Sequence, residues 1–144
     1  MSDDIIVAVT PELIAEHMKA LGFRVTTEER NGVVQLASAA QGMGFFVRFG
    51  NKAPQSHGFL DYSFGCAVRF DGALPADLVT QWIRTRRFSR LWEQDQLLVL
   101  EMDVLVAGGV RPDHLREAIQ VWDRLLQEFF LYLKQSRRPA QAAQ

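Results

Sequence analysis

Residues 80–110 read TQWIRTRRFSRLWEQDQLLVLEMDVLVAGGV, and residues 96–106 within this stretch predict a long β-strand. Successive side chains of a strand point to opposite faces of its sheet. The even positions form an unbroken apolar row, whereas Glu101 and Asp103 interrupt the odd row. This pattern predicts an antiparallel sheet that is covered on one side and at least partly wet on the other. The even row consists of Leu98, Leu100, Met102, Val104 and Val106.

The segments on either side of this strand extend the prediction. A short strand around Trp92 and a turn before residue 96 make residues 88–106 a hairpin. Gly108 and Gly109 release the chain from the sheet, because glycine adopts positive φ at little cost. Pro112 then opens a long amphipathic helix that we expect to end at about Gln135.

The N-terminal half predicts two further helices and four strands. Thr10 is a candidate cap for a first helix that begins at Pro11 and stops at Gly22. A second helix is predicted over residues 75–87, with Leu78, Val79, Trp82 and Ile83 facing inward. The predicted strands are 23–30 and 33–37, joined by a tight turn, followed by 45–49 and 60–70.

The predicted order of elements is α-β-β-β-β-α-β-β-α. Because the strands do not alternate regularly with helices, this order predicts an α+β fold. We expect a single antiparallel sheet of five to six strands with three helices, two of them on one face. A chain of 144 residues is most simply one domain, which we place at residues 1–135. Residues 136–144 are expected to form a disordered tail.

Composition excludes several classes of function. With a formal net charge of −1 at pH 7, the protein has no overall electrostatic attraction to nucleic acid or anionic lipid. No apolar run approaches the roughly 20 residues that span a bilayer. A single cysteine, Cys66, excludes an internal disulfide and fits a reducing compartment. We therefore expect a cytoplasmic protein that binds neither nucleic acid nor membrane.

No catalytic or metal-binding signature is present in the sequence. His17, His57 and His114 lie in separate elements and lack a metal-ligand spacing. Cys66 falls in an apolar strand row, where a thiol acts as a small hydrophobic group. Glu101 and Asp103 share a strand face and could form a carboxylate pair. Their position on the solvent-exposed face of a sheet would account for two acidic residues equally well. We expect no enzyme activity, cofactor or metal.

Two features are candidates for interaction with a partner. The densest basic cluster could bind an anionic segment or could favour a helix C-terminus, and it consists of Arg84, Arg86, Arg87 and Arg90. The last helix has an apolar arc wider than a helix on a single sheet needs. This excess predicts either a second subunit or partner, or a deep internal groove. Its candidate residues are Val121, Trp122, Phe129 and Tyr132.

The sequence resembles the YbjN family of bacterial proteins. The resemblance rests on Trp82, on Arg86-Arg87-Phe88-Ser89-Arg90 leading into Trp92, on 97–106, and on Gly109-Val110 before a helix containing Phe129-Phe130. It implies a sensory transduction regulator without established catalytic residues. It also implies a fold similar to class I type III secretion chaperones, which are small dimers that bind extended protein segments. This chain departs from the family pattern at Ile83, where many members have asparagine.

Together these observations predict a non-enzymatic protein-binding domain, chaperone-like or a regulatory adaptor of bacterial signalling. We expect the protein to be a homodimer. It would bury apolar side chains of a bound protein segment in a groove. The alternative is a small-molecule-binding sensory domain with a pocket between sheet and helices.

Overall fold

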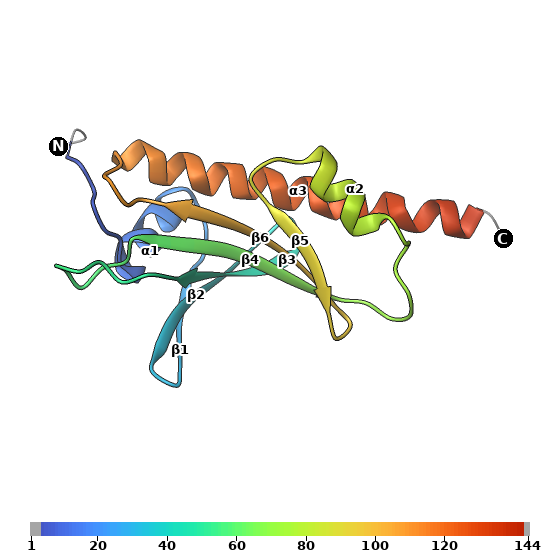
Figure 1. The fold of residues 1–144 in the computed structure, drawn as a ribbon, viewed down its shortest axis with the longest axis horizontal. Helices are drawn as coiled ribbons and strands as arrows, with labels where there is room; N and C mark the ends of the chain where they lie inside the picture. The colour runs from blue at the N-terminus through green and yellow to red at the C-terminus, as the bar shows by residue number, and fades with distance from the viewer. Residues whose placement is uncertain (1–3, 143–144) are drawn as a thin grey trace.

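The computed structural model describes residues 4–142 (Figure 1). The elements follow the predicted order. They are α1 (Pro11–Ala20), β1 (Thr26–Arg30), β2 (Val33–Ala40), β3 (Met43–Phe49), β4 (Asp61–Arg69), α2 (Leu78–Thr85), β5 (Arg90–Gln94), β6 (Leu97–Leu105) and α3 (Pro112–Ala142).

The strands form one six-stranded sheet in the order β1-β2-β3-β4-β6-β5, and every neighbouring pair is antiparallel. This confirms the predicted α+β class and the single antiparallel sheet. The β5–β6 hairpin turns at Asp95 and Gln96, which both have positive φ. Two such residues match the twist that a tight hairpin requires.

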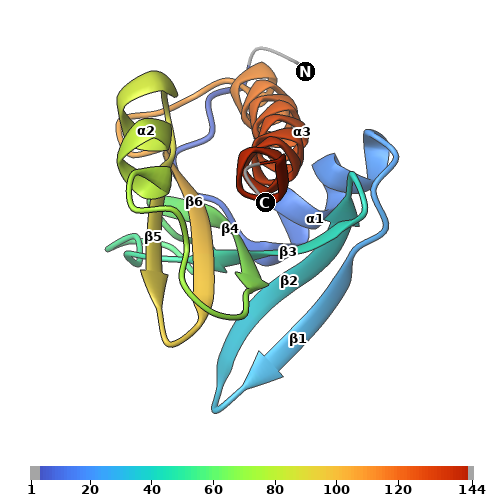
Figure 2. The same ribbon diagram turned by 90° about the vertical axis from the view of Figure 1, so that its right-hand side faces the viewer.

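All three helices lie on the same face of the sheet, with α3 running across it between α1 and α2 (Figure 2). The prediction placed two of them there. Ile14 of α1, Trp82 of α2 and Trp122 of α3 are each fully buried in one shared core. No helix of the described chain covers the opposite face, which is therefore open to solvent (Figure 2).

The core uses the even row of β6, as predicted. Leu98, Leu100, Met102, Val104 and Val106 are all buried. Aromatic rings fill the space between the sheet and α3. The Trp122 indole stacks on the Phe64 ring at 5.5 Å between centroids and meets the Phe45 ring edge-on at 5.9 Å.

The ends of the helices follow the predictions in part. The Thr10 hydroxyl accepts a hydrogen bond from the Leu13 N–H at 3.1 Å, so Thr10 caps α1 as expected. Helix α2 is shorter than predicted, and Ile83 is 51% exposed instead of facing inward. Leu78 and Trp82, one turn apart, bury its inner face, and the next residue is rotated by about 100° toward solvent.

Helix α3 continues to Ala142, past the end that we expected at Gln135. The segment before Pro139 contains no glycine that could end the helix. The predicted end of this helix was therefore wrong. The expected disorder of residues 136–144 stays a prediction, and residues 143 and 144 lie outside the described residues.

A candidate partner-binding surface on the open face of the sheet

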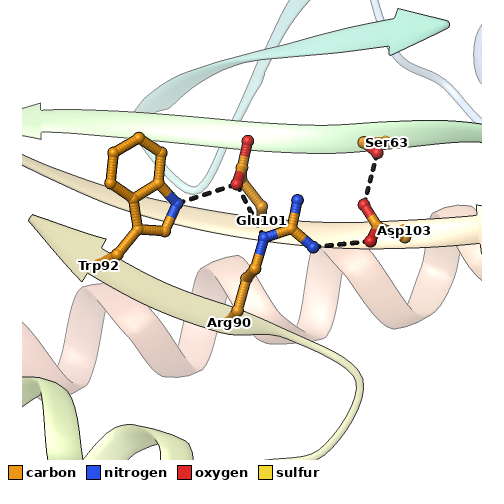
Figure 3. Close-up of polar contacts among 5 residues, drawn as sticks. All are labelled: Ser63, Arg90, Trp92, Glu101 and Asp103. Carbon is orange, nitrogen blue, oxygen red and sulfur yellow. Dashed lines mark hydrogen bonds and ion pairs between the residues drawn. The ribbon is translucent and has the colours of Figure 1, made fainter. Parts of the chain in front are cut away.

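Arg90 is the centre of a polar network on the open face. Strand register places Arg90 opposite Glu101, with Asp103 two residues further along on the same face. The guanidinium Nε donates to Glu101 Oε1 at 3.0 Å, and Nη1 donates to Asp103 Oδ2 at 2.6 Å (Figure 3). One arginine thus holds two carboxylates that the sequence analysis had considered as a pair.

Trp92 and Ser63 complete this network from the neighbouring strands. The Trp92 indole Nε1 donates to Glu101 Oε1 at 2.9 Å, and the Ser63 hydroxyl donates to Asp103 Oδ1 at 2.6 Å (Figure 3). Strands β4, β5 and β6 each contribute at least one of these side chains. We call Ser63, Arg90, Trp92, Glu101 and Asp103 the open-face network.

The network shifts the pKa values of two of its members, Arg90 and Asp103. The hydrogen bond from Arg90 lowers the pKa of the Asp103 carboxyl; partial burial opposes this shift, and the Ser63 hydrogen bond adds to it. The hydrogen bond to Asp103 in turn raises the pKa of Arg90. A carboxylate held in this way is a weak base, so the geometry favours binding over proton transfer.

Replacing Asp103 with asparagine is expected to destabilise the fold at neutral pH, and to cost less as the pH falls. Because the pKa of Asp103 is lowered in the folded state, its contribution is fully present above the ordinary aspartate pKa of about 3.9. The contribution is lost as the pH falls through the lowered folded value. Chemical denaturation of both proteins over a pH series measures the gap, which is the difference between their free energies of unfolding. The side chain is 59% exposed, so the gap should be modest. A gap that stays constant into acid would contradict this account.

The same face continues toward β1 as a second set of stacked side chains. The Phe46 ring lies over Gly65, where a Cβ atom would overlap it, and the Arg48 guanidinium lies 4.2 Å from the centroid of that ring. Gln35 accepts a hydrogen bond from Arg48 Nε and donates one to Glu28. The open face is thus an ordered surface of polar and aromatic groups.

The predicted arginine cluster is divided by the fold. Arg90 joins the open-face network, whereas Arg86 packs against the rings of Trp82 and Tyr132 and pairs with Glu128. Arg84 and Arg87 are exposed elsewhere. The division arises because α2 ends at Thr85 and the chain turns at Phe88, which has a φ of 72°.

The four candidates on α3 do not form one exposed patch. Trp122 and Phe129 are completely buried in the chain's own core, so a partner could not reach them in this conformation. The Tyr132 hydroxyl donates to the Leu78 carbonyl at 2.6 Å and thereby ties α3 to α2. Val121 is half-buried and lines a surface groove between α3 and β6. Much of the wide arc therefore serves the internal core.

The structure offers neither a metal site nor a reactive thiol beside this surface among the described residues. Within residues 4–142 no group of three or more His, Cys, Asp or Glu side chains could hold a metal ion. Cys66 lies in the core, where burial raises the pKa of its thiol to about 11. A thiol in this state is a poor nucleophile at neutral pH.

Comparison with known protein families gives one match. The model of the YbjN family, described as "Putative bacterial sensory transduction regulator", matches residues 10–135. The chain belongs to the YbjN family. This confirms the resemblance that the sequence motifs indicated, and it covers every helix and strand up to Gln135. No curated protein and no solved structure matched this YbjN chain.

Within the described chain, α3 is the longest helix, and neither it nor the shorter helices are long and apolar enough to cross a bilayer.

Proposed function

We propose that this YbjN protein is a non-enzymatic regulatory domain that binds a segment of another protein, as an adaptor or in a chaperone-like manner. The open-face network is the observation that carries the proposal. Its side chains are held in fixed geometry by mutual hydrogen bonds, yet Arg90 and Asp103 remain 50% and 59% exposed. A preorganised surface of this kind loses little side-chain entropy when a partner binds.

The residue types on this surface also favour a protein partner. Arginine and tryptophan are the side chains most enriched at energetic centres of protein interfaces. Trp92 is 36% exposed, and Leu105 on the same face is 64% exposed, so apolar area adjoins the charged groups. Such a mixture can bury apolar side chains while polar groups fix the register of the partner.

The expected assembly and location belong to the same proposal. A homodimer would cover exposed apolar side chains such as Phe130 and Leu131 of α3, and molar mass from light scattering would decide this point. The single cysteine fits a cytoplasmic location.

A second candidate function is a small-molecule sensor. Its support is a surface hollow of about 770 Å³ at the end of the sheet, where the β4–α2 connection meets α3. The hollow is mainly apolar and falls within the usual size range of ligand sites. Its apolar lining includes Phe70, Leu74, Leu78, Leu98 and Leu133. Stabilisation by a metabolite that Leu133→Trp abolishes would favour this function.

Site-specific photo-cross-linking in the native host tests the protein-binding function. A photoreactive amino acid at position 92 should cross-link one dominant polypeptide, because this position lies on the open face. The matched control is the same amino acid at Ile83, which is 51% exposed on α2, away from the open face and from the exposed side chains of α3. The position-92 product should disappear when Arg90 is replaced by glutamate. Equal products from both positions, or none from position 92, would contradict the proposal.

A further inference from the structure

Strand β6 has a free edge at its C-terminal end, beyond the point where its pairing with β5 stops at Arg90. Strand β5 pairs with β6 from Gln94 opposite Leu97 to Arg90 opposite Glu101, whereas β6 continues to Leu105. On its other side β6 is paired with β4 along its full length. The last residues of β6 therefore have a strand neighbour on one side only within the described chain.

Hydrogen-bond alternation shows which backbone groups this edge exposes. The N–H of Val106 donates to the Leu60 carbonyl, and the N–H of Phe70 donates to the Gln96 carbonyl. Even positions of β6 therefore face β4, and odd positions face the side of β5. The N–H and C=O groups of Asp103 and Leu105 face this same side, at positions that β5 does not reach. Among the described residues, none of these four groups has a backbone partner there.

Phe88 explains why β5 does not continue along this edge. Its φ of 72° turns the chain away from the position opposite Asp103, and its side chain is 70% exposed. The preceding helix fixes this departure, because Trp82 Nε1 donates to the Ser89 hydroxyl at 3.1 Å. Positive φ is uncommon for a bulky residue and often marks a functional segment.

A groove of about 380 Å³ lies beside the free edge, between β6 and α3. Phe88 contributes to it from one end, and Ala118 and Val121 contribute from α3. Glu117 and His114 also line it from α3. A strand laid along the edge would point alternate side chains into this groove and onto the open face.

We propose that the free edge of β6 binds an extended segment of a partner protein as an added strand in line with β5. This inference rests on the proposed protein-binding function and names its binding mode. Unpaired backbone groups along a strand supply the hydrogen bonds, and the groove supplies a site for an apolar side chain opposite Val104. The neighbouring side chains of the segment lie on the open face beside Asp103 and Leu105.

Charge defines the chemistry of the segment. Glu101 and Asp103 share the single guanidinium of Arg90, and Glu117 adds a further carboxylate at the groove. The surroundings of the edge thus carry excess negative charge. A segment with a basic residue next to an apolar one complements them. A second copy pairing through the same edge would bring the carboxylates of both copies together, which disfavours that occupant.

Proline at position 105 provides a direct test. Leu105→Pro removes the one N–H that faces the free edge at that position and leaves the β4–β6 ladder intact. Leu105→Ala is the matched control, because it loses the side chain and keeps the N–H. The probe is a short, capped, fluorescein-labelled peptide that alternates valine and lysine, with binding followed by fluorescence anisotropy. We expect Leu105→Ala to bind within a few fold of wild type and Leu105→Pro to bind roughly tenfold more weakly.

One further arm keeps the test independent of variant folding. The same peptide, N-methylated at its central lysine, should bind unaltered protein far more weakly, since it lacks a backbone donor. Absent binding by wild type, or equal binding by both variants, would overturn the strand-addition mode. A wild-type dimer that Leu105→Pro converts to a monomer would show that a second copy occupies the edge, and would also overturn it. If Leu105→Pro retains the cross-link from position 92, partner binding stands and the edge is not its site.

Discussion

Replacing Trp122 with alanine is expected to destabilise the protein by about 3–5 kcal/mol, the range for removing a large buried aromatic side chain. Trp122 is fully buried and contacts the rings of Phe64 and Phe45. Its indole N–H has no hydrogen-bond partner among the described residues, so its contribution comes from packing. The free energy of unfolding from chemical denaturation measures the loss.

Trp92→Ala is the matched control on the opposite face. Trp92 is 36% exposed and gives up one hydrogen bond to Glu101, so its loss should be about 1 kcal/mol. If Trp122 acted mainly as an anchor for a partner, the isolated chain would lose little stability from its removal. Similar losses for the two alanine variants would therefore contradict the assignment of Trp122 to the core.

The comparison between these two tryptophans shows what sequence periodicity can predict. A period of two identifies strands and their buried face from neighbouring residues alone, and it predicted the even row of β6. A helical arc, by contrast, shows that a side chain is apolar but not what covers it. The width of the apolar arc on α3 was compatible with a partner. In the structure, most of this arc is buried in the core that α3 shares with the sheet and the other two helices. Ile83 was misplaced for a related reason: the residue is apolar, but it lies about 100° around the helix from the buried Trp82 and is 51% exposed.

The open-face network was predictable in part. Arg90, Glu101 and Asp103 were each noticed in the sequence, but their contacts depend on the register of the β5–β6 hairpin. A tight turn at Asp95-Gln96 would have fixed that register, and the pairing of Arg90 with Glu101 follows from it. Ser63 could not be found in this way. It lies 40 positions from Asp103 and reaches it through the β4–β6 pairing, which the tertiary fold sets.

The free edge of β6 was outside the reach of local patterns. Its existence depends on where β5 begins, and the positive φ of Phe88 sets that point. Nothing in the amino-acid pattern of residues 86–90 predicts a left-handed phenylalanine, because bulky residues rarely adopt this conformation. The feature that most distinguishes the edge is thus one that only the folded backbone reveals.

Replacing Leu100 with alanine is expected to lower the free energy of unfolding by roughly 2–5 kcal/mol, because a buried leucine leaves a cavity in addition to its lost burial. Leu100 is fully buried at the centre of β6, between Cys66 of β4 and Leu91 of β5. The core cannot close this space easily, since both neighbouring strands are paired to β6 through their backbones. Chemical denaturation of the purified variant measures the change.

Leu105→Ala is the control, because it makes the same substitution in the same strand on the other face. Leu105 is 64% exposed, so this change should cost only about 0.5 kcal/mol or less. The contrast tests the register of β6 itself, since a shift of one residue would exchange the two faces. A larger loss from Leu105→Ala than from Leu100→Ala would mean that the even row is not the buried row. In that case the groups assigned to the free edge would face β4 instead, and the strand-addition mode would fail with the register.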